Sequence, residues 1–174
     1  MKFTQTPNSP TQAVTRVLAF DPGFERLGVA LVVKEQGREA VLFSDCLRTP
    51  ATLPFDERLY QLGAQAELLI EQWAPDAVAL EEIYFENNAK TAMKVAEVRG
   101  MLAYIARSYS LPLFHYTPLE VKVAITGYGK SDKAAVTMMV NRLVTLPPRK
   151  CLDDELDAVA VGLTCLASAR TNLR

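Results

Sequence analysis

Five short apolar runs limit the folds that this sequence can adopt. The first three, residues 17–21, 28–33 and 40–47, are separated only by short turn-forming stretches, which favour an antiparallel meander. The last two, residues 77–80 and 111–116, each follow a segment long enough for a helix, as parallel crossovers require. The order predicts an α/β fold with a five-stranded mixed sheet, three antiparallel strands then two parallel, and helices on both faces.

Apolar residues at helical spacing predict four helices around this sheet. The first covers residues 55–73 and the second roughly residues 90–109. Ser131 can cap a third helix. The predicted buried face of that helix consists of Val136, Met139, Val140 and Leu143. The last helix is expected to begin near Asp153 or Asp154.

Length and composition indicate one folded domain. The chain has 174 residues, of which 49% are hydrophobic and 22% charged, so disordered, collagen-like and disulfide-scaffold classes are excluded. Residues 1–15, with Pro7 and Pro10 near their centre, are expected to form a flexible arm, and residues 16–174 a single domain.

The few histidines and cysteines exclude other classes of site. A single histidine, His115, excludes zinc sites built from two or three imidazoles. Three widely spaced cysteines without a CxxC pair are typical of a reduced chain, so a cytoplasmic location is expected. No signal peptide or membrane span is recognised, and no membrane partner is expected.

Charge is distributed unevenly along the chain. Residues 51–86 carry eight acidic and one basic side chain, whereas residues 87–150 carry ten basic and three acidic ones. Such a pattern suits a polyanion held near bound cations. Solvated helix faces that happen to segregate by sign explain the same counts, and the counts alone favour this second interpretation.

Four acidic residues lie where carboxylates are hard to explain structurally. Asp21 and Glu81 each close an apolar run, so both are expected at the C-terminal ends of neighbouring strands, where open α/β sheets carry their sites. Asp154 and Asp157 lie three apart at the start of an apolar helix and share one face of it. Carboxylates that meet repel one another unless cations are present. Oxygen ligands favour Mg²⁺ or Mn²⁺, and two such ions about 4 Å apart can hydrolyse a phosphodiester.

Each acid alone also has a structural interpretation. The Asp21 segment could be an ordinary turn, and Glu81 a surface residue at a strand end. Asp153 and Asp154 could be acids that the helix macrodipole favours. Only the joint pattern favours the metal site.

A series of short motifs follows the chain in order. It consists of Phe20-Asp21-Pro22-Gly23 with Gly28, Ala79-Leu80-Glu81-Glu82-Ile83-Tyr84, Asn88-Ala89-Lys90-Thr91-Ala92, Val98-Arg99-Gly100, Val121-Lys122, Gly127-Tyr128-Gly129-Lys130, Lys133 and Asp154-Glu155-Leu156-Asp157-Ala158-Val159-Ala160. Over about residues 16–168 this series resembles the RuvC-type Holliday junction resolvases of the ribonuclease H-like superfamily. The opening motif is shared across that superfamily, so the ordered series carries the resemblance.

The resemblance implies a ribonuclease H-like nuclease domain and a crossover junction endodeoxyribonuclease. Such an enzyme would bind a four-way DNA junction as a homodimer and make paired symmetric nicks in homologous recombination and DNA repair. Asp21, Glu81, Asp154 and Asp157 match the catalytic acids that would hold two Mg²⁺ ions, with Mn²⁺ as a substitute. A branch-migration motor is an implied partner.

The resemblance also implies residues that contact DNA. Lys122 and Lys133 match basic residues near the scissile phosphate, and the DNA-binding set as a whole would be Lys122, Lys130, Lys133, Tyr84, Asn88 and Thr91. Tyr84 suits stacking on unpaired bases, and equally suits a buried core position. Phe24 and Glu25 depart from the family pattern, which leaves DNA contacts at those positions open.

Three other functions fit parts of the sequence. The opening motif also resembles shorter YqgF-type nucleases that act on structured RNA, although the segments 88–100 and 127–133 argue against them. An actin-like ATP-binding kinase normally needs two such domains, which 174 residues do not hold. A non-catalytic junction-binding module remains open if the acids fail to bind metal.

Overall fold

A five-stranded mixed sheet forms the centre of the molecule. The structure is a computed structural model that describes residues 15–82 and 89–169, the side chains of residues 89–91 excepted. In order along the chain the strands are β1 (Arg16–Asp21), β2 (Arg26–Glu35), β3 (Arg38–Arg48), β4 (Ala77–Glu81) and β5 (Leu113–Tyr116), and their order in the sheet is β3-β2-β1-β4-β5. β1, β2 and β3 pair antiparallel, whereas β4 and β5 run parallel to β1. The predicted sheet is therefore confirmed.

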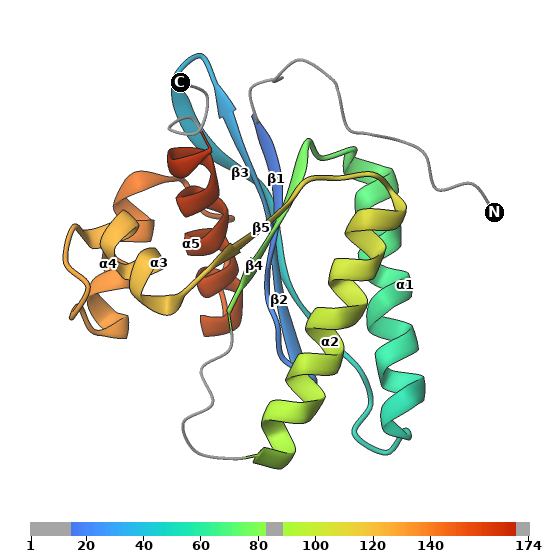
Figure 1. The fold of residues 1–174 in the computed structure, drawn as a ribbon. Coiled ribbons are helices and arrows are strands. Elements are labelled where there is room, and N and C mark those ends of the chain that lie inside the picture. The colour runs from blue at the N-terminus through green and yellow to red at the C-terminus, as the bar shows by residue number, and fades with distance from the viewer. Residues whose placement is uncertain (1–14, 83–88, 170–174) are drawn as a thin grey trace.

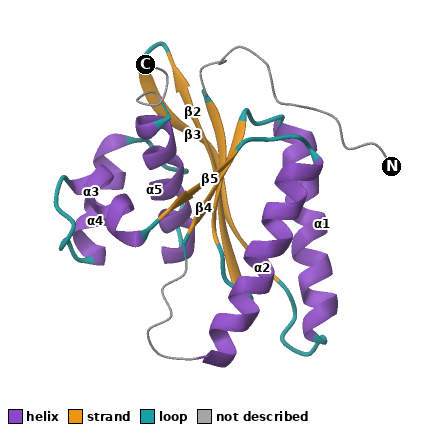
Figure 2. Ribbon diagram, viewed as in Figure 1, coloured by secondary structure: helices purple, strands orange, loops and turns teal. Residues whose placement is uncertain are grey.

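Helices cover both faces of the sheet, as predicted. They are α1 (Phe55–Trp73), α2 (Ala89–Ser108), α3 (Pro118–Thr126), α4 (Lys133–Leu143) and α5 (Asp153–Ser168). Figures 1 and 2 show α1 and α2 on one side of the sheet and α3, α4 and α5 on the other. No helix in the described part of the chain is long and apolar enough to cross a membrane.

One helix, α3, was not predicted. Its signal was nevertheless present, because Thr117 and Glu120 form a capping box and Pro118 occupies the first helical position, which suits proline. The Thr117 Oγ1 accepts from the Glu120 N–H at 3.2 Å, and the Glu120 carboxylate accepts from the Thr117 N–H at 2.7 Å. A helix of nine residues is too short to show a clear apolar period, which explains the omission.

Two predictions about α4 are wrong in detail. Asp132, not Ser131, caps the helix, because its carboxylate accepts from the Ala135 N–H at 2.8 Å. The Ser131 hydroxyl instead shares a hydrogen bond of 2.8 Å with Thr126 Oγ1. Leu143 was expected in the buried face but is 48% exposed.

Thr15, predicted to be the last residue of the N-terminal arm, is hydrogen-bonded to the domain. Residues 1–14 lie outside the described part of the chain. Thr15 donates through its N–H and its hydroxyl to Asp76 Oδ2, at 3.0 and 2.9 Å. Its carbonyl accepts from the Lys34 N–H at 2.7 Å. Thr15 is thus bonded to the segment before β4 and to β2.

Side chains alternate between two hydrophobic cores along the central strand. Val17 and Ala19 of β1 belong to the core beneath α5, whereas Leu18 and Phe20 belong to the core beneath α1 and α2. All four are at most 1% exposed, as expected for a strand covered on both faces. Because the period is two residues, the residue that follows Phe20 points toward the α5 side.

Small residues let α5 pack closely against the sheet. A Cβ atom at Gly162 would lie 2.6 Å from Val32 Cγ2 and 3.3 Å from Ala19 Cβ. Ala30 and Ala79 of the neighbouring strands are likewise fully buried in this core. The axis of α5 can therefore approach β1 and β2 more closely than larger side chains would permit.

We expect Gly162→Ala to lower the free energy of unfolding by about 1–3 kcal/mol, because the added methyl group overpacks this contact. Gly100→Ala is the matched control. A Cβ there meets no described atom within 4 Å, and alanine favours a helix over glycine by about 1 kcal/mol. Thermal unfolding of both variants checks the prediction, and equal shifts in Tm would contradict it.

Candidate active site

Asp21 and Glu81 lie side by side at one edge of the sheet. β1 and β4 are parallel neighbours whose registered pairs end with Phe20 and Leu80, one residue before each acid. In β4, Leu80 faces the α1 and α2 core and Ala79 faces the α5 core. The alternation therefore directs both carboxylates to the α5 side, at the C-terminal ends of their strands.

The first turn of α5 brings Asp154 and Asp157 to the same edge. A Cβ at Gly28 would lie 1.9 Å from the Asp154 carbonyl oxygen and 3.3 Å from Asp21 Cβ. Gly28 is also the ladder partner of Asp21 in β2. Only glycine leaves room for the helix start to rest on β2 here, which gives a physical reason for the Gly28 motif.

An ion pair between the buried Glu155 and the half-exposed Arg149 helps to fix the first turn of α5 to β3. Glu155 is 1% exposed and accepts from both terminal nitrogens of Arg149, at 2.7 and 3.0 Å. It also accepts from Ser44 Oγ at 2.5 Å and from the Leu152 N–H at 3.2 Å, while Arg149 donates to the Ser44 carbonyl at 2.7 Å. Burial would raise the pKa of Glu155, but these donors outweigh it and lower the pKa. Glu155 is therefore a structural anion that holds its acidic neighbours in place.

The four carboxylates interact electrostatically. Burial, followed by Glu81, Asp157 and Asp154, raises the pKa of Asp21 to about 8. Burial and then Asp157 raise the pKa of Glu81 to about 7, against the influence of Lys133 and Lys122. Burial also raises the pKa of Asp157. Without a cation, this edge holds more negative charge than its surroundings stabilise.

Lys133 supplies part of the missing positive charge. Its Nζ lies 2.8 Å from Asp157 Oδ2 and 3.7 Å from Asp153 Oδ2. The two acids differ in exposure, since the Asp153 side chain is 77% exposed and that of Asp157 is 29% exposed. Lys133 begins α4, so this helix start directs a cation into the acidic edge.

The donor set suits a hard divalent cation, but it is not a closed cage in this structure. Within residues 15–82 and 89–169, no group of three or more His, Cys, Asp or Glu side chains is placed to hold a metal ion. Four carboxylates with no imidazole among them are oxygen donors of the kind that Mg²⁺ prefers. Metal binding would therefore require these side chains to converge further, and Asp157 to exchange its bond with Lys133.

The structure describes only some of the other residues that were predicted to contact DNA. Lys130 is exposed in the turn between α3 and α4. Lys122 lies on α3 and is close enough to Glu81 to affect its pKa. Tyr84 and Asn88 lie outside the described residues, and Thr91 lies in α2 with its side chain not described.

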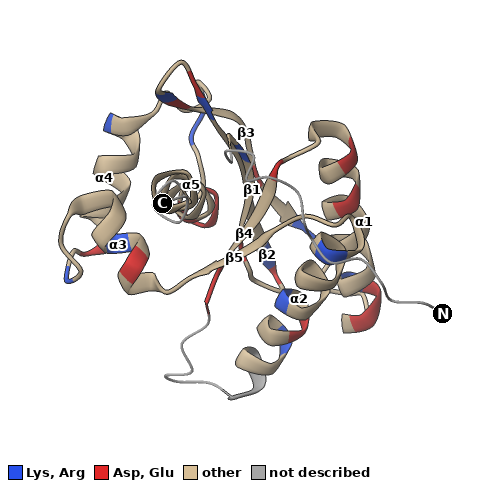
Figure 3. Ribbon diagram, turned by 45° about the horizontal axis from the view of Figure 1, so that its top comes forward, with Lys and Arg blue, Asp and Glu red and all other residues tan. Residues whose placement is uncertain are grey.

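The acidic block of the sequence forms mainly a solvated helix face. Asp56, Glu57, Glu67 and Glu71 are exposed on α1, on the opposite side of the sheet from α5. Figure 3 shows these acidic positions along α1. The structure thus favours the solvated-face interpretation for this block, and the acids at the end of β1 and β4 and the start of α5 form a separate group.

The sequence of the whole domain matches one family. The family described as crossover junction endodeoxyribonuclease RuvC matches residues 17–165. This chain belongs to the RuvC family. The RuvC of Syntrophomonas wolfei is 39% identical to it over 155 residues, which are 89% of this chain and 90% of that relative. The predicted enzyme class, an endonuclease that hydrolyses DNA, is therefore confirmed.

Solved structures agree with the family assignment. Thermus thermophilus RuvC, in a structure described as a complex with a Holliday junction substrate, superposes with a TM-score of 0.84 at 29% identity, covering 91% of this chain and 97% of that one. The yeast mitochondrial resolvase Ydc2 has a TM-score of 0.69 at 14% identity, covering 95% and 84%, and shows the shared fold. The predicted ribonuclease H-like fold is confirmed.

Two neighbours of the four acids were not identified from the sequence. Arg26 Nη1 lies 3.6 Å from Asp154 Oδ2, and Cys46 Sγ lies 4.0 Å from the same atom. The strand period explains both positions. Arg26 precedes Gly28 by two residues and so lies on the same face of β2, and Cys46 is the ladder partner of Gly28 on β3. The pairing register of β3 was needed to see this, and a single sequence does not supply it.

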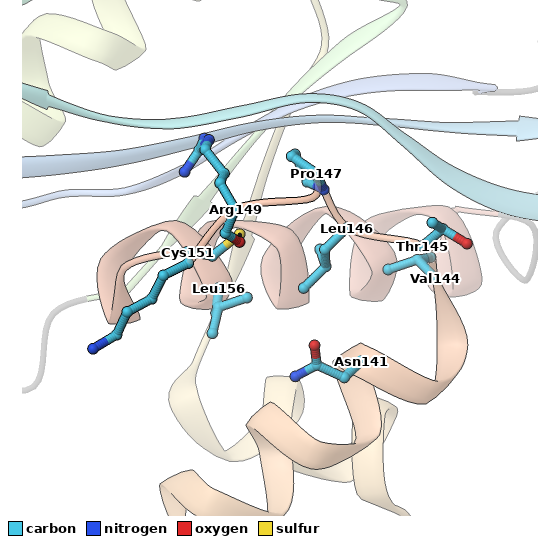
Figure 4. Close-up of a pocket in the computed structure, with 9 residues that line it drawn as sticks. Asn141, Val144, Thr145, Leu146, Pro147, Arg149, Cys151 and Leu156 are labelled. Carbon is cyan, nitrogen blue, oxygen red and sulfur yellow. Dashed lines mark hydrogen bonds between the residues drawn. The ribbon is translucent and has the colours of Figure 1, made fainter.

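A pocket elsewhere on the same side of the sheet lies apart from the acids. Its volume is about 550 Å³, and its lining comes from the end of α4, the segment before α5 and Leu156 of α5. Figure 4 shows the Arg149 side chain extending from this segment toward the strands, where it meets Glu155. None of the four acids lines this pocket.

In the absence of metal, we expect stability to fall as the pH rises from about 4 to about 8. The folded chain holds protons on Asp21 and Glu81 to a higher pH than the unfolded chain does, so each deprotonation there disfavours the fold. Asp21→Asn removes one of these charges. At pH 8 the variant should be more stable than the parent by at least ~1.4 kcal/mol, the equivalent of one pKa unit.

Thermal unfolding in a chelating buffer between pH 5 and pH 8.5 measures this difference. Glu67→Gln, an exposed position on α1, is the control and should show no gain that grows with pH. A parent protein whose Tm stays level or rises over this range would contradict the prediction.

Proposed function

We propose that this protein resolves four-way DNA junctions by paired symmetric nicks, in homologous recombination and DNA repair. The observation that carries the proposal is the convergence of Asp21, Glu81, Asp154 and Asp157 at one sheet edge, with raised pKa values on three of them. Thermus thermophilus RuvC, similar over nearly the whole chain, is described in complex with this substrate. A non-catalytic binding module would have no use for mutually repelling buried carboxylates.

The catalytic arrangement that we propose uses the four acids as ligands of two Mg²⁺ ions, with Mn²⁺ as a substitute. Bound there, the ions would supply a hydroxide nucleophile and stabilise the leaving oxygen of the phosphodiester. The acids would lose their protons on binding, since a carboxylate must be ionised to act as a ligand. Their raised pKa values therefore favour metal binding toward alkaline pH.

Lys133 changes partners in this scheme. Its ammonium group neutralises Asp157 in the metal-free protein. When Asp157 acts as a ligand, the flexible side chain is available to a phosphate oxygen, where a cation stabilises developing negative charge. Lys122 and Lys130 would bind the DNA backbone beside it. Asn88 and Thr91 would also contact the DNA, and Tyr84 would stack on unpaired bases.

The test of the proposal is cleavage of an end-labelled four-way DNA junction in Mg²⁺, with linear duplex as the control substrate. Asp154 and Asp153 offer a matched pair of variants on one helix turn, with side chains 28% and 77% exposed. We expect Asp154→Asn to reduce the cleavage rate at least ~100-fold while the junction remains bound. Asp153→Asn should stay within about threefold of the parent.

The outcomes separate the alternatives. If both variants lose the same fraction of the cleavage rate, Asp154 cannot be distinguished from Asp153 as the metal ligand, and its assignment is contradicted. Tight junction binding without nicks in Mg²⁺ or Mn²⁺ would favour a non-catalytic module. If the protein does not prefer the junction over duplex DNA, the proposal is contradicted. Structured RNA would then be the next substrate to test.

We further propose that the active form is a homodimer. Symmetric nicks on two opposed strands require two active sites, and the described residues of one chain provide a single group of four converging acids. A dimer with two-fold symmetry would place two such sites on one symmetric junction. Sedimentation or light scattering at micromolar concentration should give twice the monomer mass, with and without junction DNA, and a monomer in both conditions would contradict this.

Two further expectations belong with this function. The three cysteines, Cys46, Cys151 and Cys165, are unpaired, which agrees with a reducing compartment, and we propose the cytoplasm. A complex with a branch-migration motor stays a prediction from the family resemblance.

A further inference from the structure

Two arginines end the β2–β3 ladder directly opposite one another. Arg26 and Arg48 are registered cross-strand partners, and both are exposed. Like charges at directly opposite positions destabilise an antiparallel pair. Arg26 has a partner in Asp154, and Arg48 interacts with the Cys46 side chain. A ligand with several anionic oxygens would neutralise both guanidinium groups together.

Arg26 and its cross-strand partner Arg48 lie on the face of the sheet that α5 covers. On β2, Ala30 and Val32 point into the α5 core, so Arg26, at the same parity, lies on that face. Arg26 lies 3.6 Å from Asp154 Oδ2, while its side chain is 57% exposed. A distance of 3.6 Å is too long for a hydrogen bond, so this contact is an ion pair that does not use the hydrogen-bond donors of Arg26.

One buried arginine holds the segments that carry Arg26 and Arg48. Arg58 of α1 is 7% exposed and donates to Thr49 Oγ1 at 2.8 Å and to the Phe24 carbonyl at 3.0 Å. Thr49 follows Arg48 directly, and Phe24 lies two residues before Arg26. Phe24 also packs edge-on against Phe55, with ring centroids 6.2 Å apart. The backbone of both arginines is thus fixed in advance of any ligand.

Cations therefore lie on two sides of the candidate site. Lys133 of α4 contacts Asp157, and Lys122 of α3 lies near Glu81. Arg26 of β2 lies 3.6 Å from Asp154, and Arg48 is its cross-strand partner. We propose that Arg26 and Arg48 form a second phosphate-binding subsite, which holds the DNA strand on the β2–β3 side of the phosphate that is cleaved. The planar guanidinium group matches two phosphate oxygens at once, which lysine does not.

This inference rests on the proposed function and assigns a path to the substrate. A single strand that crosses the acids would contact the lysines with one phosphate and the arginines with a neighbouring one. Phosphate contacts of this kind set the position of the backbone and carry no base preference. The subsite would thus place the scissile bond over the carboxylates.

The salt dependence of junction binding tests the subsite. Each neutralised phosphate contributes about 0.9 to the slope of log K against log salt concentration for duplex DNA. We expect Arg26→Ala and Arg48→Ala to reduce this slope by about 0.9 each, and the double variant by about 1.8, in chelating buffer without metal.

The control is a second double variant that removes the same charge. Arg38, at the opposite end of the β2–β3 ladder, and Arg107, in the last turn of α2, are both exposed and lie away from the acids. Arg38→Ala with Arg107→Ala should leave the slope within about 0.3 of the parent. Tm values of all variants confirm that each chain is folded.

A slope unchanged in the Arg26 and Arg48 variants would overturn the proposal, and would leave Arg26 only as a counter-charge for Asp154. In that case the Mg²⁺ concentration for half-maximal cleavage would change while the slope did not. An equal loss of slope in the control pair would also overturn it, since the effect would then be one of net charge. Failure of the parent protein to prefer the junction over duplex would count against the proposed function instead, and the slopes can still be measured on duplex.

Discussion

The close packing of α5 on the sheet is the contact on which the site depends. Gly162 allows the middle of the helix to rest on Ala19 and Val32, and Gly28 allows its first turn to rest on β2. The same approach that buries the apolar face of the helix also carries Asp154 and Asp157 to the ends of the strands. Packing and site geometry are thus set by one interface, so a side chain added at either glycine would affect both.

The acidic edge is locally unfavourable in the metal-free protein, and its neighbours make it tolerable. Burial and mutual repulsion raise the pKa of Asp21 to about 8, so that proton uptake relieves part of the repulsion. Lys133 neutralises Asp157, and the Glu155–Arg149 pair fixes the helix start against β3. The hydrophobic cores on both faces of the sheet offset the free energy that the repulsion among the acids costs the fold.

The sequence predicted the sheet and four of the helices, because each depends on a local pattern. It also predicted that Asp21 and Glu81 end their strands. Apolar runs that end in Asp21 and Glu81 identify a strand end without any knowledge of the partner strand. The short helix α3 and the cap at Asp132 were missed or misplaced, because several residues near Ser131 can cap a helix equally well. Arg26 and the Glu155–Arg149 pair became visible only with the register of β3 and the path of the segment before α5, which no local pattern encodes.

The charges around the four acids suit a polymeric anion as substrate. A nucleic acid strand is held at several phosphates over an extended surface. The cations on both sides of the acids, Lys133 on one and Arg26 on the other, provide such a surface without enclosing it. In the proposed function, the acids would carry the chemistry, and the cations on α4 and β2 would set the position of the substrate.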